Sequence, residues 1–197
     1  MFLLLIIISF FVGAIPFGYI IVKHKLGIDI RKEGSGNIGS TNVKRVAGGK
    51  VSALVQFLDI TKSLVPVSLA LIFLRQDNVA KVCFVSLATI LGHIYSPFLG
   101  FKGGKGINSL LGSFILLCPL PVLISVMVHI VLKKVIKIVA IRSIILSLVI
   151  VLMSWLLGYD KSIVLSSLFA SLIIIFAHRT NLKEIFGIYN IGKKDNT

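Results

Sequence analysis

The heptapeptide GFKGGKG, residues 100–106, sets two lysines among four glycines in a chain that is otherwise strongly apolar. Glycine lets the backbone approach a ligand closely, and two ammonium groups at that point favour an anion, most simply a phosphate. A nucleotide P-loop is excluded because Leu99 stands where that motif needs its first glycine, and Gly106 stands where it needs Ser or Thr. The segment therefore predicts an anion-binding loop that does not bind nucleotides.

A second polar stretch, GSGNIGSTNVKR, covers residues 34–45 and ends in two cations. Small hydrogen-bond donors on a flexible backbone, followed by cations, suit a phosphate or a polyol. An ordinary polar turn is the alternative, with Ser40 or Thr41 capping a helix.

A third polar stretch, AHRTNLKEIFG, covers residues 177–187. His178 and Asn181 are three residues apart, so they share one face if the segment is helical. An amphipathic helix at the membrane interface is the alternative, and both descriptions can hold together.

Two further features have a structural and a functional interpretation. His93 lacks the aspartate of a His-x4-Asp acyltransferase motif, because Phe98 occupies that position, so a buried hydrogen-bonding role is favoured over catalysis. Gln56, Asp59 and Lys62 recur every three residues within an apolar stretch. Asp59 and Lys62 are expected to pair there, and a purely structural pair and a role in the site stay open.

The composition is that of an integral membrane protein, because 56% of the 197 residues are hydrophobic and the mean hydropathy is +1.02. The net charge is +14, and the cations lie in short loops between apolar stretches. That pattern is typical of topology determinants and of attraction to anionic headgroups, so no nucleic-acid partner is expected. No carboxylate cluster indicates a metal, and neither a cofactor nor an obligate protein partner is expected.

Seven apolar stretches predict an all-α helical bundle of about seven transmembrane helices in a single domain, residues 1–197. Lys and Arg concentrate in alternate connections and in the tail, which predicts an external N-terminus and a cytoplasmic C-terminus. The basic residues follow the first stretch, so a retained helix is expected there. Residues 192–197 are expected to form a disordered tail. The stretches are residues 2–22, 51–74, 79–95, 107–118, 121–132, 143–157 and 162–177.

Two of these stretches, residues 107–118 and 121–132, fall short of the roughly 20 residues that a full crossing needs. Either interfacial residues extend them, or they are short or broken helices that end inside the protein. A half-helix beginning near Gly106 would point its first N–H groups at the GFKGGKG loop, which also favours an anion.

In order along the chain, residues 34–45, residues 92–109 and His178 with Asn181 resemble the three motifs of the acyl-phosphate:glycerol-3-phosphate acyltransferase family (PlsY). Residues 13–20, GAIPFGYI, resemble the family's first helix, so the resemblance covers nearly the whole chain. It implies transfer of a fatty acyl group from acyl-phosphate to the sn-1 hydroxyl of glycerol 3-phosphate. The implied product is lysophosphatidic acid, an intermediate of phospholipid biosynthesis.

The resemblance also implies the residues of the site and their surroundings. The implied location is the cytoplasmic (inner) membrane, with a multi-pass chain, a site facing the cytoplasm and membrane lipid as its neighbour. The family's phosphate and glycerol contacts, and with them catalytic roles, carry over to Ser35, Arg45, Lys105, His178 and Asn181. Substrate binding is implied for the other matched positions, which are Asn37, Thr41, Asn42, His93, Gly103 and Gly104.

Three departures from the family pattern stand out. Ser63 replaces the glycine of an Asp-x-x-Lys-Gly motif, and Ile188 follows Gly187 where an acidic residue is usual. A Thr-Arg-Tyr-x-Ser stretch is degraded to residues 141–145, IRSII, with Ile145 in the place of its serine. Activity is still expected, with altered substrate affinity if that serine binds substrate.

The implied reaction suits positioning and charge stabilisation, because acyl-phosphate is already activated. The proton of the attacking hydroxyl is expected to pass to the donor's own phosphate, with His178 as the alternative base. A transporter of a phosphorylated or anionic metabolite is the alternative function, and it would need a polar pathway through several spans.

Overall fold

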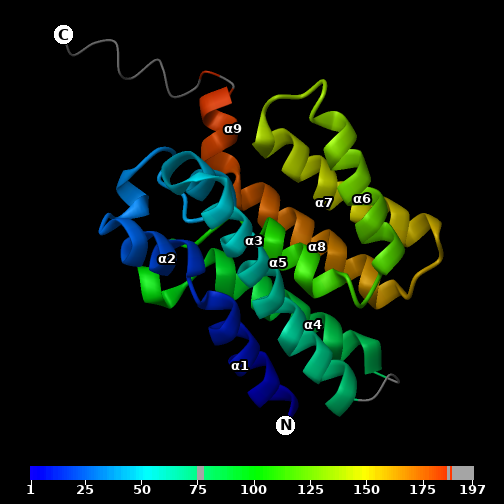
Figure 1. The fold of residues 1–197 in the computed structure, drawn as a ribbon. Coiled ribbons are helices and arrows are strands. Elements are labelled where there is room, and N and C mark those ends of the chain that lie inside the picture. The colour runs from blue at the N-terminus through cyan, green and yellow to red at the C-terminus, as the bar shows by residue number, and fades with distance from the viewer. Residues whose placement is uncertain (75–77, 186, 188–197) are drawn as a thin grey trace.

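The computed structural model describes residues 1–74, 78–185 and 187, and the regular structure in these ranges is helical (Figure 1). The predicted all-α class is therefore confirmed. The helices are α1 (Phe2–Ala14), α2 (Phe17–Leu26), α3 (Ser40–Phe73), α4 (Val79–Ile94), α5 (Ile107–Phe114), α6 (Pro119–Leu132), α7 (Val139–Leu156), α8 (Lys161–Ala177) and α9 (Arg179–Ile185), with short 3-10 turns η1 (Ile30–Lys32) and η3 (Pro97–Leu99).

Four segments of the described chain are long and apolar enough to cross a membrane: Phe2–Leu26, Ser40–Phe73, Val79–Leu99 and Val139–Leu156. The helices Pro119–Leu132 and Lys161–Ala177 are apolar but shorter. Large apolar side chains such as Phe57, Ile72 and Phe176 are exposed, as expected of helices that face lipid. The predicted membrane bundle is confirmed as a class, whereas the seven crossings and the orientation of the termini stay predictions.

The first apolar stretch is not the single helix predicted over residues 2–22, because it breaks at Ile15 and Pro16. Proline has no N–H and disfavours helical geometry in the residue before it. The carbonyls freed by the break have partners inside the protein. The Ser96 hydroxyl donates to the Ala14 carbonyl at 2.6 Å, and Lys62 Nζ donates to the Ile15 carbonyl at 2.7 Å. Irregular backbone within a membrane bundle needs such internal partners.

Helix α3 begins eleven residues before the apolar stretch predicted to start at residue 51, and it bends at Gly48. Gly48 has φ 83° and ψ 174°, a conformation that is essentially restricted to glycine. The short segment before the bend carries Thr41 and Arg45, so the bend sets their direction relative to the membrane-crossing part of α3.

The helices pack in pairs, α1 on α4, α3 on α5, α6 on α7, and α8 on both α4 and α7 (Figure 1). Hydroxyl groups join neighbouring helices inside the bundle. Thr89 on α4 and Ser113 on α5 lie 2.7 Å apart, and Ser171 on α8 donates to the Ser147 carbonyl on α7 at 2.9 Å. Such interhelical hydrogen bonds stabilise packing where the surroundings offer no water.

Helix α5 has eight residues and begins directly after Gly106, so the predicted half-helix is confirmed. Its length of about 12 Å is far below the thickness of a bilayer. The chain turns back after Phe114 and enters α6 at Pro119. The GFKGGKG loop is thus followed by a helix that ends within the protein.

Candidate active site

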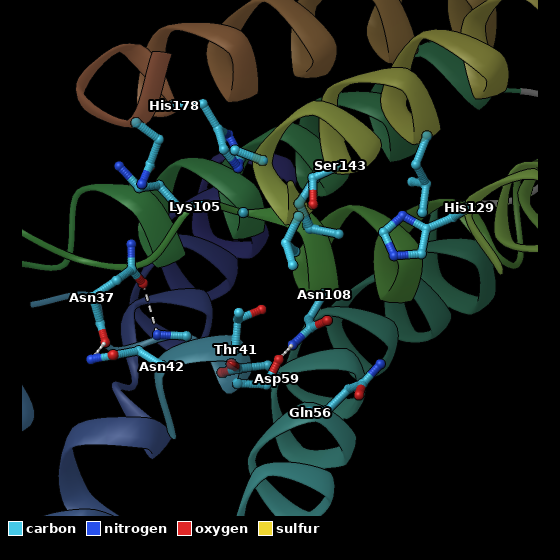
Figure 2. Close-up of a pocket in the computed structure, with 18 of the residues that line it drawn as sticks. Asn37, Thr41, Asn42, Gln56, Asp59, Lys105, Asn108, His129, Ser143 and His178 are labelled. Carbon is cyan, nitrogen blue, oxygen red and sulfur yellow. Dashed lines mark hydrogen bonds between the residues drawn. The ribbon is translucent and has the colours of Figure 1, made fainter. Parts of the chain in front are cut away.

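The three polar stretches meet in one cleft of about 740 Å³, bounded by α3 and α5 and by α6 and α7 (Figure 2). Every predicted site residue lines this cleft except Gly103 and Gly104. The polar lining comprises Ser35, Asn37, Ser40, Thr41, Asn42, Arg45, Gln56, Asp59, His93, Lys105, Asn108, His129, Lys137, Ser143, His178 and Asn181.

The first stretch forms a loop that is held together by Asn42. The amide of this buried side chain donates to the carbonyls of Glu33 and Asn37 at 2.9 and 2.8 Å, and its oxygen accepts from the Ser35 N–H at 2.9 Å. Asn42 therefore has its hydrogen-bonding capacity engaged by the backbone and positions the loop. Ser35 and Arg45 are exposed at the cleft, where their polar groups can meet a ligand.

Gly103 and Gly104, which do not line the cleft, determine the conformation of the GFKGGKG loop. Gly103 and Gly104 donate their N–H groups to the carbonyls of Ile94 and His93 at 2.9 and 3.0 Å. A side chain on Gly103 would collide with the His93 carbonyl, and one on Gly104 would collide with the imidazole ring. Glycine is required at both positions by the close approach to His93, and no ligand contact is needed to explain it.

A buried ion pair lies next to His93, the residue on which the glycine loop packs. Lys62 and Asp59 form the ion pair that the sequence predicts, with Lys62 Nζ 2.8 Å from Asp59 Oδ1. His93 Nδ1 lies 3.8 Å from the same oxygen, and His93 is almost fully buried. Asp59 and His93 also line the cleft, so the pair is both structural and part of the site wall.

Of the two loop lysines, Lys105 faces the cleft and Lys102 is exposed outside it. Lys105 Nζ donates to the Ala177 carbonyl at 2.5 Å and to the Thr180 hydroxyl at 3.2 Å. These bonds join the glycine loop to the end of α8, where the third stretch begins. Lys105 therefore links the second polar stretch to the third.

His178 directly follows α8 and is only 4% exposed. Its Nδ1 lies 2.8 Å from the Ile174 carbonyl, which can only accept, so this nitrogen carries the proton and Nε2 is an acceptor in the neutral ring. Burial lowers the pKa of His178, and the positive charge of Lys105 lowers it further, against the opposing effect of the Ile174 hydrogen bond. The ring is therefore neutral near pH 7. Asn181 lines the cleft one helical turn away.

The sequence did not single out the wall that α7 provides. Lys137 and Ser143 line the cleft from this wall, together with the first residues of α7, whose N-terminus has no side-chain cap. Ser143 is 5% exposed, and its hydroxyl makes no hydrogen bond to a described residue. The stretch expected to have lost its serine at Ile145 therefore still supplies a hydroxyl. Lys137 belongs to the basic α6–α7 connection, and the sequence alone indicates only a role in topology for such loop cations.

Further polar groups missed by the sequence patterns are Ser40, Gln56, Asn108 and His129. Asn108 donates to the Ser40 hydroxyl at 3.2 Å across the α3–α5 junction. His129 and Gln56 lie at the end of the cleft away from Lys105 and His178 (Figure 2). Isolated polar residues on apolar helices have no spacing that reveals a shared site, so only the packing of α3 against α5 and α6 against α7 could find them.

The remainder of the cleft is apolar, and its lining comes from α5, α6 and the start of α7. One cleft thus combines cations and hydrogen-bonding groups with aliphatic side chains. The aliphatic lining comprises Ile107, Leu111, Val126, Ile130, Ile138, Val139, Ala140 and Leu146.

Comparison with known proteins gives matches over most of the chain. The family model described as glycerol-3-phosphate acyltransferase matches residues 3–187. The glycerol-3-phosphate acyltransferase of Clostridium acetobutylicum is 42% identical over 182 residues, which are 90% of this chain and 92% of the relative. That of Aquifex aeolicus is 36% identical over 183 residues, covering 93% and 94% of the two chains.

Two crystal structures of PlsY, an integral membrane glycerol 3-phosphate acyltransferase, share the fold. The glycerol 3-phosphate form has a TM-score of 0.89 at 34% identity, and the lysophosphatidic acid form has a TM-score of 0.86 at 33% identity. Each comparison covers 94% of this chain and 92% of the solved one. The chain therefore belongs to the glycerol-3-phosphate acyltransferase family.

Proposed function

We propose that the protein transfers a fatty acyl group from an acyl-phosphate to the sn-1 hydroxyl of glycerol 3-phosphate, giving lysophosphatidic acid and inorganic phosphate. The observation that carries this proposal is one cleft whose lining combines cations with aliphatic side chains. Both substrates bear phosphate, and the donor also bears an apolar chain. The names of the relatives and of the two solved PlsY forms support the same acceptor and product.

The acceptor, glycerol 3-phosphate, is placed at the end of the cleft that contains Lys105. Lys105 and Arg45 supply positive charge for its phosphate, while Ser35 and Asn181 supply hydrogen bonds for its polar oxygens. Figure 2 shows Lys105 and His178 together at this end of the cleft.

The donor phosphate is placed at the start of α7. The uncapped N–H groups of an 18-residue helix, Lys137 beside them and the Ser143 hydroxyl form a second anion-binding wall in the same cleft. The acyl chain then lies along the aliphatic lining, which includes Leu111, Val126 and Leu146. This arrangement keeps two like-charged phosphates apart while their reacting atoms approach.

The reaction needs no covalent enzyme intermediate. The acceptor hydroxyl attacks the acyl carbon, the bond from that carbon to the phosphate oxygen breaks, and the leaving phosphate takes the hydroxyl proton. Neutral His178, with Nε2 as an acceptor, either orients the hydroxyl or receives the proton in its place. Most of the rate then comes from positioning and from cations near the developing negative charge.

The proposed location is the cytoplasmic membrane, with the cleft facing the cytoplasm. Exposed cations lie in or next to the segments that line the cleft, around the first polar stretch and in the α6–α7 connection; these include Lys23, Lys25, Arg31, Lys32, Lys44, Lys133 and Lys134. The positive-inside rule assigns such a side to the cytoplasm. No obligate protein partner is required, since both substrates reach the cleft from the cytosol or from lipid.

A single assay tests the activity. Purified protein in detergent is mixed with palmitoyl phosphate and radiolabelled glycerol 3-phosphate, with palmitoyl-CoA as the control donor. Labelled lysophosphatidic acid should form from the acyl-phosphate alone. Folded protein that gives no product with either donor would contradict the proposal, and uptake of label into proteoliposomes without product would favour a transporter.

A further inference from the structure

Two cations are buried inside the helical bundle, and their surroundings differ. Lys62 is 5% exposed, pairs with Asp59 at 2.8 Å and donates to the Ile15 carbonyl at 2.7 Å. Arg142, on the first turns of α7, is 6% exposed, and its Nε is fully enclosed. No hydrogen bond or ion pair joins the Arg142 guanidinium to any residue that the structure describes.

The neighbouring sequence offers Arg142 no counter-ion, because residues 78–159 contain neither Asp nor Glu. The carboxylates of the described chain are engaged or placed elsewhere. Asp29 pairs with Arg31, Asp59 pairs with Lys62, Glu33 is exposed directly after η1, and Asp160 caps α8 beyond the far end of α7. Helix α7 has 18 residues and is about 27 Å long, so Asp160 cannot reach the first turns.

A buried charge without a partner is costly, and an ionisable residue within a membrane bundle ordinarily marks a site whose ligand supplies the partner. No described residue supplies a counter-ion for Arg142, and we infer that an anion from outside the chain fills this role. Arginine favours phosphate as a ligand because its planar donors match two phosphate oxygens at once.

Arg142 lies beside the catalytic cleft and is not part of its lining. Ser143, Lys137 and His129 line the catalytic cleft, but Arg142 does not. His129 Nδ1 lies 3.3 Å from the Arg142 carbonyl, which fixes the end of α6 against the start of α7. Exposed Lys133 and Lys134 lie in the connection between these helices.

The same two helices carry exposed apolar side chains, as expected of helices that contact lipid. On α6 these include Leu123, Met127 and Val131, and on α7 they include Leu152 and Trp155. An anion at Arg142 therefore lies at the junction between the basic connection and the lipid-facing helices, which is where phospholipid headgroups are found.

We propose that the α6–α7 hairpin binds the phosphate of an anionic phospholipid, with Arg142 as its buried counter-ion and Lys133 and Lys134 at the rim. This site lies outside the catalytic cleft and does not depend on the acyl-transfer proposal. It gives the protein a lipid requirement that concerns stability and is separate from the binding of either substrate.

The melting temperature in dodecyl maltoside tests the site, because the effect of Arg142→Met should depend on whether anionic lipid is present. Without anionic lipid, Arg142→Met should melt above the wild type, because an unpaired buried charge has been replaced by an apolar side chain of similar size. Adding phosphatidylglycerol should raise the wild-type melting temperature by several degrees and leave Arg142→Met unchanged, and phosphatidylcholine should affect neither. Arg142→Lys should keep part of the response.

Arg179→Met is the matched control, since this exposed arginine already contacts the Phe176 ring and carbonyl; its response to phosphatidylglycerol should equal that of the wild type. Native mass spectrometry should detect co-purified anionic lipid on the wild type and lose it on Arg142→Gln. Two outcomes would overturn the proposal. One is an Arg142→Met protein that melts below the wild type without lipid. The other is stabilisation by acetyl phosphate or inorganic phosphate in place of phospholipid.

Discussion

At the scale of single residues, the glycine loop distinguishes two lysines that look alike in the sequence. Lys105 reaches the end of α8 and lines the cleft, whereas Lys102 is exposed outside it. Fixed donors from Gly103 and Gly104 hold the loop on α4, so the direction of each lysine follows from the backbone. A cation in the cleft can act on substrate phosphate, while a cation outside it contributes to topology and to headgroup contact.

Lys105→Met is therefore expected to reduce kcat/KM for glycerol 3-phosphate strongly. Loss of a hydrogen bond to a charged group costs about 1.5–3 kcal/mol, which is roughly a 10- to 100-fold loss in kcat/KM. Lys102→Met is the matched control in the same loop and should keep wild-type kinetics. Equal losses in the two variants would mean that the loop binds phosphate through its net charge rather than through Lys105. Steady-state kinetics with palmitoyl phosphate as donor decides between the two results.

We expect kcat/KM to depend on pH through His178, and burial of this residue sets the direction of the change. Its pKa lies below the ordinary value of about 6.5, so the neutral ring, with Nε2 as an acceptor, is the form present near pH 7. The kcat/KM of the wild type should be level above about pH 6.5 and should fall as the pH drops through the lowered pKa. His178→Asn should lose this acidic limb from whatever activity remains, and an unchanged profile would contradict the assignment.

The lowered pKa of His178 also makes the folded protein less stable as the pH falls. The unfolded chain binds a proton to His178 at a higher pH than the folded chain does. Its contribution to folding is therefore complete above the ordinary pKa of about 6.5 and declines as the pH falls through the folded-state pKa. Melting temperature measured beside kcat/KM separates loss of fold from loss of function.

At the scale of elements, the site is built where helices are interrupted. Helix α1 ends at the Ile15–Pro16 break, α3 bends at Gly48, and α5 ends after eight residues. Each interruption frees backbone groups or redirects a segment at the depth of the cleft. Continuous helices would bury the same polar residues without bringing them together.

The bend in α3 gives a prediction with an adjacent control. No atom lies near a side chain added at either Gly48 or Gly49, so steric clashes do not distinguish the two positions. Only Gly48 has a non-helical backbone, with φ 83°. Gly48→Ala should cost about 1–3 kcal/mol of stability and raise the KM for glycerol 3-phosphate, because Arg45 lies on the redirected segment.

Gly49→Ala should instead keep the wild-type KM and gain about 0.5–1 kcal/mol, as for an alanine in an ordinary helical position. Thermal melts and initial-rate kinetics on both variants provide the comparison. A Gly48→Ala protein with wild-type stability and KM would show that the bend does not position Arg45.

At the scale of the whole molecule, the cleft combines cationic and aliphatic lining at the basic end of a lipid-facing bundle. Helix α9 and the α6–α7 connection lie at one end of the molecule, and the N-terminus lies at the opposite end (Figure 1). This arrangement lets a polar acceptor approach from water and an apolar donor approach from lipid. In the proposed reaction, the membrane is the reservoir for the acyl donor and the cytosol supplies the acceptor.

The sequence alone determined the class of the molecule and most of its polar site. Long apolar stretches between basic loops require a helical membrane bundle, because only such a bundle satisfies the backbone in lipid. Compact polar runs such as residues 34–45 and GFKGGKG stand out locally against the apolar stretches around them. The Asp59–Lys62 pair was predictable for the same reason, since two charges one helical turn apart inside a span favour each other.

Only the tertiary structure decided which residues face the cleft and which support it. Asn42 lines the cleft and also holds the loop through its backbone contacts, and Ser143 supplies a hydroxyl to the wall although Ile145 replaces the family's serine. The isolation of Arg142 was equally invisible, since a chain with 21 cations does not reveal which one is buried without an acid. Spacing along one helix predicts which residues share a face, but the partner of that face depends on how separate helices pack. Helix packing is set by contacts between residues far apart in sequence, which no local pattern contains.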